Sequence, residues 1–412
     1  MTTITVANCY PDWNRGGSAL TFAACGLARG LGANRLRVQS ITDPGPGGYA
    51  AEYRHTLGHF PEARIEEPIG VHGRESASLG RRVVVAGSSH TRALFARSQW
   101  EDHGATDMVL GRGGVIFRSG FNMRSAAMLY LRLTPLLLAP RAGIPTVIYG
   151  AHIDPIRYAP ARHIAGSALE AAELVIVRDE VSAENARALT SSMKRLIVAP
   201  DSVFALSESW LDGLPDDLVP RAWLASRFAV VCLSGGERGG FAEREKEVAS
   251  RLAAALDRIL RQGLVDRVLV LAQRNDPASG DAKEGKRFAS MIGPAATFLS
   301  EDLSPTQLMG LYREAALVTG TRLHSTILAL AAGGLGAPID MGPSHRMPAV
   351  YEEVGLREFV ATELMSPGQL AEHLTGLVED REKHLKTVAQ ALVQARSRLS
   401  GAATEIGRLF AS

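Results

Sequence analysis

The stretch Ala316–Gly333 reads ALVTGTRLHSTILALAAG and contains a strand pattern followed directly by a helix pattern. The β-branched run ends at Gly320, and apolar residues at helical spacing begin near His324. A strand that passes into a helix through a short turn is the repeating unit of a parallel α/β sheet. This stretch therefore predicts an α/β protein, with Arg322 and His324 on the turn between strand and helix.

The same step recurs along the chain. LVIVRDEVSAENARAL, at Leu174–Leu189, also runs from strand into helix, and other short β-branched runs alternate with helical segments. This alternation predicts two doubly wound, Rossmann-like domains in a GT-B-like arrangement, with an inter-domain cleft. The expected strands lie at residues 4–8, 35–41, 82–87, 107–111, 146–150, 174–179, 195–201, 228–234, 267–273, 316–321 and 337–342.

One segment without a clear strand, residues 206–226, contains two prolines and separates the two blocks of strands. We interpret it as a linker between an N-terminal domain at 1–205 and a C-terminal domain at 227–370. Residues 371–412 are expected to form one or two helices that pack back on both domains.

The composition limits the classes of function. The 412 residues carry a net charge of +2, too small to recruit nucleic acid or an anionic membrane by itself. Cys9, Cys25 and Cys232 are widely spaced, which argues against a disulfide framework and against a zinc site. No charged leader followed by an apolar run is found at the start, so we expect a cytoplasmic protein. The cysteine spacing leads us to expect no metal centre.

The longest apolar stretch, Leu129–Pro140, is interrupted by Arg132 and Pro135 and is too short to cross a bilayer. We interpret it as a buried helix and predict no transmembrane segment. Peripheral contact with a membrane surface stays open.

The turn after Gly320 has the groups that bind and protonate an anion. A helix N-terminus offers unpaired N–H groups, Arg322 adds a guanidinium fork, and His324 exchanges protons near neutral pH. The alternative is that His324 caps its own helix while Arg322 pairs with a surface carboxylate. Arg178 is expected in the same position, at the end of a strand, where open sheets bind ligands. The alternative is that it forms a surface pair with Asp179.

Further motifs give a family resemblance. In order and spacing they resemble the polysaccharide pyruvyl transferase family over nearly the whole chain. The segments that carry the resemblance are NRGGSAL (Asn14–Leu20), LGRGGVIF (Leu110–Phe117), VRDEVS (Val177–Ser182), APDSVFAL (Ala199–Leu206), TRLHSTILAL (Thr321–Leu330) and GPSHRMPAVYEEVGL (Gly342–Leu356).

The resemblance implies an enzyme that moves the enolpyruvyl carbons of phosphoenolpyruvate onto two hydroxyls of a sugar or glycolipid, as in bacterial exopolysaccharide synthesis. Phosphoenolpyruvate is then a co-substrate, and no other cofactor is implied. The N-terminal domain is the expected acceptor side, and the C-terminal domain is the expected donor side. His324 is implied as the acid, and the substrate-binding residues are implied to be Arg178, Arg322, Leu323 through its backbone, Arg346, Asn14, Gly16, Gly113 and Gly114.

Two positions depart from the family pattern. Gly17 stands where the family usually has Asp, and Arg346 stands where we expect Lys. The first departure keeps open a member repurposed for a natural-product acceptor. A GT-B glycosyltransferase using a nucleotide sugar is the other alternative, but the acidic residue that would grip its ribose is not found before Asp340.

Three weaker signals are interpreted as structural. GDAKEGKR, at Gly280–Arg287, fails the phosphate-loop pattern and is expected to be a solvated loop. His152 and Asp154 could bind a metal or activate a hydroxyl. Because no third ligand is found, we favour a structural histidine at the edge of the cleft, with its hydrogen bonds made within the protein. Asp201 is expected to be structural. The glycine-rich loop Gly235–Gly240 is equally consistent with a phosphate cradle and with a solvated turn.

Overall fold

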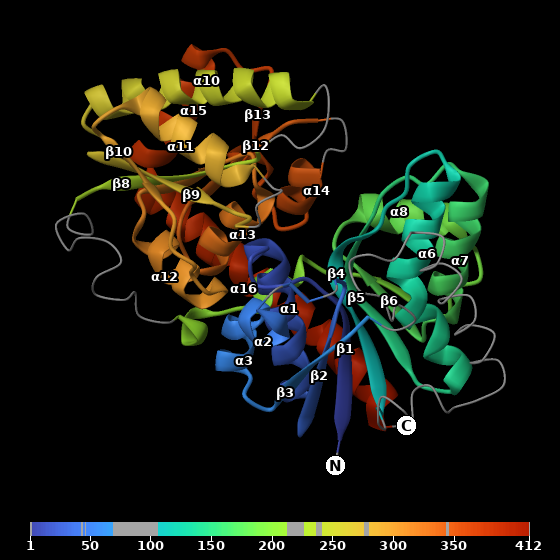
Figure 1. The fold of residues 1–412 in the computed structure, drawn as a ribbon. Helices are drawn as coiled ribbons and strands as arrows, with labels where there is room; N and C mark the ends of the chain where they lie inside the picture. Colours follow the sequence, from blue (N-terminus) through green and yellow to red (C-terminus); the bar gives the residue numbers. More distant parts are fainter. Residues whose placement is uncertain are drawn as a thin grey trace. The chain divides into compact units, whose positions relative to one another are not determined.

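The computed structural model describes residues 2–42, 44–45, 47–68, 106–211, 226–235, 241–275, 280–342 and 346–411. The expected strand at 82–87 and most of the loop at 235–240 lie outside these ranges. The chain divides into two units, each built on one sheet with helices around it (Figure 1). The first unit comprises Met1–Asp12, Leu20–Ser202 and Ser397–Ser412, and the second comprises Trp13–Ala19 and Val203–Arg396.

The first unit contains a parallel sheet with the strand order β3-β2-β1-β4-β5-β6-β7. The order reverses between β1 and β4, the switch point at which sheets of this kind bind ligands. Its strands are β1 (Thr3–Cys9), β2 (Arg35–Ser40), β3 (Ala63–Glu66), β4 (Met108–Phe117), β5 (Thr146–Ile153), β6 (Leu174–Val177) and β7 (Leu196–Val198). Among the described residues before Ser202, the helices are α1 (Arg15–Gly30), α2 (Gly48–Glu52), α3 (Arg54–His59), α6 (Met123–Leu138), α7 (Ala159–Ala171) and α8 (Glu180–Leu189).

The second unit repeats this topology. Its parallel sheet has the order β10-β9-β8-β11-β12-β13, with the switch point between β8 and β11. Its strands are β8 (Phe228–Leu233), β9 (Arg267–Ala272), β10 (Ala296–Leu299), β11 (Leu317–Gly320), β12 (Gly336–Asp340) and β13 (Ala361–Thr362). The later helices are α10 (Phe241–Arg261), α11 (Asp281–Ile292), α12 (Pro305–Glu314), α13 (Leu323–Ala331), α14 (Arg346–Glu352), α15 (Pro367–Glu379) and α16 (Arg381–Ala411). Short 3-10 turns occupy Pro140–Ala142, Ser202–Ala205, Glu208–Trp210 and Arg357–Phe359.

Burial explains why these sequences form parallel sheets. β1, β5 and β8 are buried along their whole length, as expected for strands covered by helices on both faces. The apolar stretch that begins at Leu129 lies in α6, whose leucines from Leu129 to Leu138 are buried. The buried helix is therefore confirmed. No helix within the described ranges is long and apolar enough to span a membrane.

The prediction of two Rossmann-like units is confirmed, while the cleft between them stays a prediction. The sequence pattern missed the edge strands β3, β10 and β13, because β3 and β10 are short and only partly buried and β13 has only two residues. It was also wrong for Gly280–Arg287, which is the start of α11 and not a loop. Gly280 has a φ of +69°, a conformation that glycine adopts readily, and the helix begins at the next residue.

Candidate functional site

The turn between β11 and α13 lies at the switch point of the second sheet. Gly320 has a φ of +133°, and a Cβ there would lie 2.1 Å from the carbonyl oxygen of Cys232 in β8. The glycine therefore lets β11 end tightly against β8. Arg322 is the N-cap of α13, and Leu323 and His324 form its first turn. The interpretation of His324 as the cap of its own helix is wrong.

Arg322 is held by a carboxylate at the start of α11. Its Nε donates to Oδ2 of Asp281 at 3.0 Å, and its Nη2 donates to Oδ1 of the same side chain. Asp281 is fully buried and also accepts hydrogen bonds from the backbone N–H groups of Gly235 and Arg274. The partner is thus not a surface carboxylate. This bidentate pair fixes the guanidinium through Nε and Nη2, and no hydrogen bond joins Nη1 to any other described residue.

His324 packs against the first turn of α1, although the two lie far apart in the sequence. A Cβ built on Gly16 would lie 2.8 Å from Nδ1 of His324 and 2.9 Å from its Cβ and Cγ. Asn14 caps α1, because its Oδ1 accepts a hydrogen bond from the N–H of Gly17 at 3.0 Å. Residues 13–19 are connected to the second sheet through an isolated bridge between Asn14 and Arg274.

Two helix N-termini therefore meet in the second unit, that of α1 at Gly16 and that of α13 at His324. The dipole of each helix places partial positive charge at its start. The guanidinium of Arg322 lies beside the start of α13, paired with Asp281. The arrangement suits a small anion with several oxygen atoms. It brings together Asn14, Gly16, Arg322, Leu323 and His324 among the predicted site residues. Asp281 was not predicted, because no sequence pattern pointed to it.

Replacing Gly16 by Ala is expected to lower turnover about tenfold, because the new methyl group would push the base of the His324 side chain aside. A displacement of about 1 Å at a reacting group costs up to roughly 10²-fold. Steady-state kinetics with the donor and an acceptor measure the effect. Gly30→Ala is the matched control, since Gly30 lies in the same helix and a Cβ there meets nothing within 4 Å. Equal activity of the two variants would contradict the contact between Gly16 and His324.

Arg178 lies in the first unit, at the end of β6, and is 1% exposed. Its Nη1 donates to Oδ2 of Asp201 at 3.1 Å, and its Nε lies 3.5 Å from Oδ2 of Asp179. The pair between Arg178 and Asp179 therefore exists, but it is buried and not on the surface as the alternative had it. Arg178 and Arg322 both lie between the end of a strand and the start of a helix, as predicted. They differ in their place in the sheet, because β6 lies two strands from the switch point whereas β11 lies at it.

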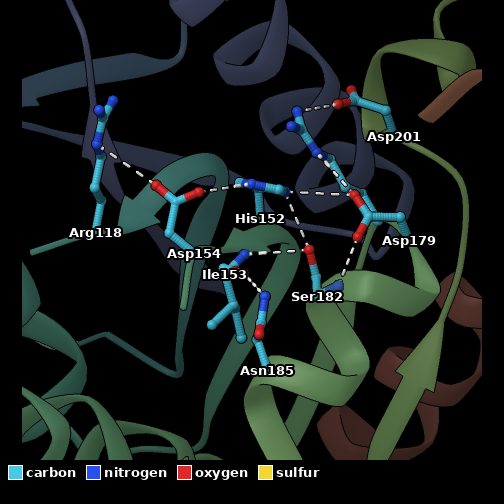
Figure 2. A network of polar contacts seen from close by, with 9 residues as sticks. Arg118, His152, Ile153, Asp154, Asp179, Ser182, Asn185 and Asp201 are labelled. Atoms are coloured by element: carbon cyan, nitrogen blue, oxygen red, sulfur yellow. Dashed lines mark hydrogen bonds and ion pairs between the residues drawn. The ribbon is translucent and has the colours of Figure 1, made fainter. Parts of the chain in front are cut away.

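A histidine extends this buried network (Figure 2). His152 Nε2 lies 3.0 Å from Oδ1 of Asp154, and His152 Nδ1 lies 3.1 Å from Oγ of Ser182 and 3.4 Å from Oδ2 of Asp179. Burial opposes ionisation of Asp179, but the hydrogen bond from His152 and the charge of Arg178 outweigh it and hold the pKa of Asp179 well below its usual range. Both ring nitrogens of His152 therefore have polar partners, with Asp154 on one side and Asp179 on the other. This fits the structural role that we favoured for His152.

Gly113 and Gly114 serve the packing of the first sheet. A Cβ on Gly113 would lie 2.3 Å from the carbonyl oxygen of Gly150 in β5, and Gly114 has a φ of +95°. The close approach therefore comes from the neighbouring strand, and a contact with substrate stays a prediction. Arg346 is the first residue of α14. The described residues contain no group of three or more His, Cys, Asp or Glu side chains that could hold a metal ion.

Two Rossmann-like units with these topologies define the GT-B class of folds, and solved structures of that class match the chain over its whole length. Sucrose-phosphate synthase from Thermosynechococcus elongatus has a TM-score of 0.60 and 14% identity, covering 100% of this chain and 98% of that one. HepE from Anabaena, in complex with UDP and glucose, has a TM-score of 0.57 and 14% identity, covering 100% of both chains. A UDP-glucosyltransferase from Polygonum tinctorium has a TM-score of 0.58 and 13% identity, covering 100% of this chain and 99% of that one.

At such low identities the likeness shows the fold alone. The family is shown by the sequence, because the model of the polysaccharide pyruvyl transferase family matches residues 46–334. The chain belongs to this family. No curated protein matches it significantly.

Proposed function

We propose that this chain is a phosphoenolpyruvate-dependent pyruvyl transferase that forms a cyclic ketal on a sugar or a related polyol. The observation that supports the proposal is the meeting of Arg322, His324 and the N-termini of α1 and α13 in a member of this family. Phosphoenolpyruvate is a small, highly charged anion, and it needs both fixed cations and a proton donor. This turn supplies both.

In the proposed reaction His324 gives a proton to C3 of the enol, so that C2 becomes electrophilic. One acceptor hydroxyl adds to C2 and loses its proton. The second hydroxyl then attacks C2, the bond between C2 and the phosphate oxygen breaks, and its electron pair leaves with inorganic phosphate. Of the two protons released by the hydroxyls, one restores His324 and the other ends on phosphate.

Arg322 and the N–H of Leu323 are proposed to hold the donor, with Arg178 and Arg346 as further cationic contacts. The departing phosphate needs stabilisation of developing negative charge, which fixed guanidinium groups provide without reorganisation. A sugar or glycolipid acceptor, a cytoplasmic site of action and a role in bacterial exopolysaccharide synthesis belong to the same proposal. The UDP and glucose bound by HepE support a sugar-binding fold.

Phosphoenolpyruvate is expected to raise the melting temperature of the protein in the presence of EDTA, because a ligand that binds only the folded state stabilises it by mass action. At a concentration about 100 times Kd the gain is about 2.7 kcal/mol. Differential scanning fluorimetry with phosphoenolpyruvate, pyruvate and UDP-glucose measures it. A shift that requires a divalent cation, or one that only the nucleotide sugar produces, would contradict the donor assignment and favour a glycosyltransferase.

A further inference from the structure

Arg15, the first residue of α1, is a buried cation in the second unit. It is 1% exposed, and its Nη2 donates to the carbonyl oxygen of Glu301. Within the described ranges, its Nε and Nη1 have no hydrogen-bond partner, and no carboxylate forms an ion pair with it. A buried guanidinium without a counter-charge is unfavourable by several kcal/mol, and such groups normally meet an anion.

The neighbourhood of Arg15 contains a second buried polar group. The backbone N–H of Arg15 donates to the carbonyl oxygen of Gln273 at 3.2 Å, at the carboxyl end of β9. The side chain of Gln273 is 3% exposed, and neither its Nε2 nor its Oε1 has a hydrogen-bond partner among the described residues. Two unsatisfied, buried side chains on adjoining segments point to a polar ligand.

The position of Arg15 relates it to the site already described. The next residue, Gly16, packs against His324. Burial raises the pKa of the Cys232 thiol at the end of β8, and Tyr312, Arg15 and Ser325 act against that rise, so the charge of Arg15 is felt at the switch point. Ser325 directly follows His324 in α13. Arg15 therefore lies by the carboxyl ends of β9 and β10, and its charge also acts on Cys232 in β8.

Arg15 and Arg322 differ in whether a carboxylate neutralises the charge of the guanidinium. Both oxygen atoms of Asp281 bind Arg322, so that pair is close to neutral as a unit. In the part of the chain that the structure describes, the side chain of Arg15 has only the backbone carbonyl of Glu301 as a partner. A dianionic group is attracted most strongly by the cation that has no carboxylate partner, whereas a singly charged carboxylate is satisfied by hydrogen bonds from Arg322 and from the start of α13.

We propose that Arg15, assisted by the amide of Gln273, binds the phosphoryl group of the donor. This inference rests on the proposed function, because it divides the two anionic groups of phosphoenolpyruvate between two places. Arg15 and the start of α1 take the phosphoryl group, and the turn at Arg322 takes the carboxylate. Arg15 is then the residue that faces the leaving group.

The test compares Arg15→Met and Arg15→Lys with the full-length protein, using calorimetry with phosphoenolpyruvate and with inorganic phosphate. Arg15→Met is expected to weaken both ligands at least about 30-fold, and Arg15→Lys less. The ligand-free Arg15→Met protein is expected to melt no lower than the parent, because an apolar side chain replaces a buried, uncompensated charge. Arg35→Met, which removes an exposed arginine at the start of β2, is the control.

The outcomes separate this inference from the proposed function. If the parent binds phosphoenolpyruvate and Arg15→Met binds it equally well, Arg15 is structural and the inference is wrong, although the donor assignment stands. If Arg15→Met melts well below the parent, the Arg15→Lys variant decides. The inference is also overturned if Arg15→Lys melts below the parent but binds phosphate with the affinity of the parent. If the parent binds inorganic phosphate through Arg15 but not phosphoenolpyruvate, the anion site stands and the proposed function fails. Binding of neither ligand overturns both.

Discussion

Replacing His324 by Gln is expected to lower turnover about 10²-fold or more, while the affinity for phosphoenolpyruvate stays within a few fold. Glutamine keeps hydrogen-bonding capacity at the start of α13 but cannot give a proton to C3 of the enol. The cations that hold the donor are untouched, so binding and chemistry separate. The alkaline limb of the pH profile of turnover is expected to disappear, because that limb reports the loss of the acid.

Turnover of His324→Gln and His324→Ala is measured with an authentic acceptor, and donor binding is measured by calorimetry. His163→Gln is the control, since His163 is an exposed histidine of α7. Near-normal turnover of His324→Gln would mean that another group supplies the proton. Loss of donor binding in both His324 variants would instead make His324 a binding residue.

Arg322→Ala is expected to weaken the binding of phosphoenolpyruvate by about 2 to 5 kcal/mol, the usual loss when one partner of a buried charged contact is removed. The same change strips Asp281 of its ion pair, and Asp281 is fully buried. The melting temperature is therefore expected to fall as well. Arg322→Lys, which keeps a charge beside Asp281 but not the planar fork, is expected to restore stability more than affinity.

Asp281→Asn separates the two effects. It removes the carboxylate but leaves the guanidinium of Arg322, so stability is expected to fall while donor affinity is kept or increased. Calorimetry and thermal unfolding of the same preparations give both quantities. If Asp281→Asn lost donor affinity as fully as Arg322→Ala does, the expectation of independent effects would be wrong, and the carboxylate of Asp281 would be needed to position Arg322 for the donor.

Local patterns in the sequence predicted the parallel sheets and the position of Arg322 and His324 after β11, because both depend on residues close together in the chain. The contact between Gly16 and His324 could not be predicted in this way, since it joins two distant segments. Asp281 was missed because GDAKEGKR has many polar residues and begins with glycine, which looks like a loop until the helix is seen to pack on β9. Arg178 was located at the end of its strand, but its burial beside Asp201 depends on β7 and the segment that follows it.

The early segment Trp13–Ala19 belongs to the second unit, and this has a consequence for the order in which the protein folds. The contact of Arg15 with Glu301 joins residues 286 positions apart, and the contact of Gly16 with His324 spans a similar stretch. During synthesis the first sheet can form as soon as its strands leave the ribosome, but these contacts must wait until the second sheet has been made. A nascent or truncated chain can therefore hold a complete first sheet and still lack a formed site. The site is therefore among the last parts of the protein to form, because the start of α1 reaches its final position only when nearly the whole protein has folded.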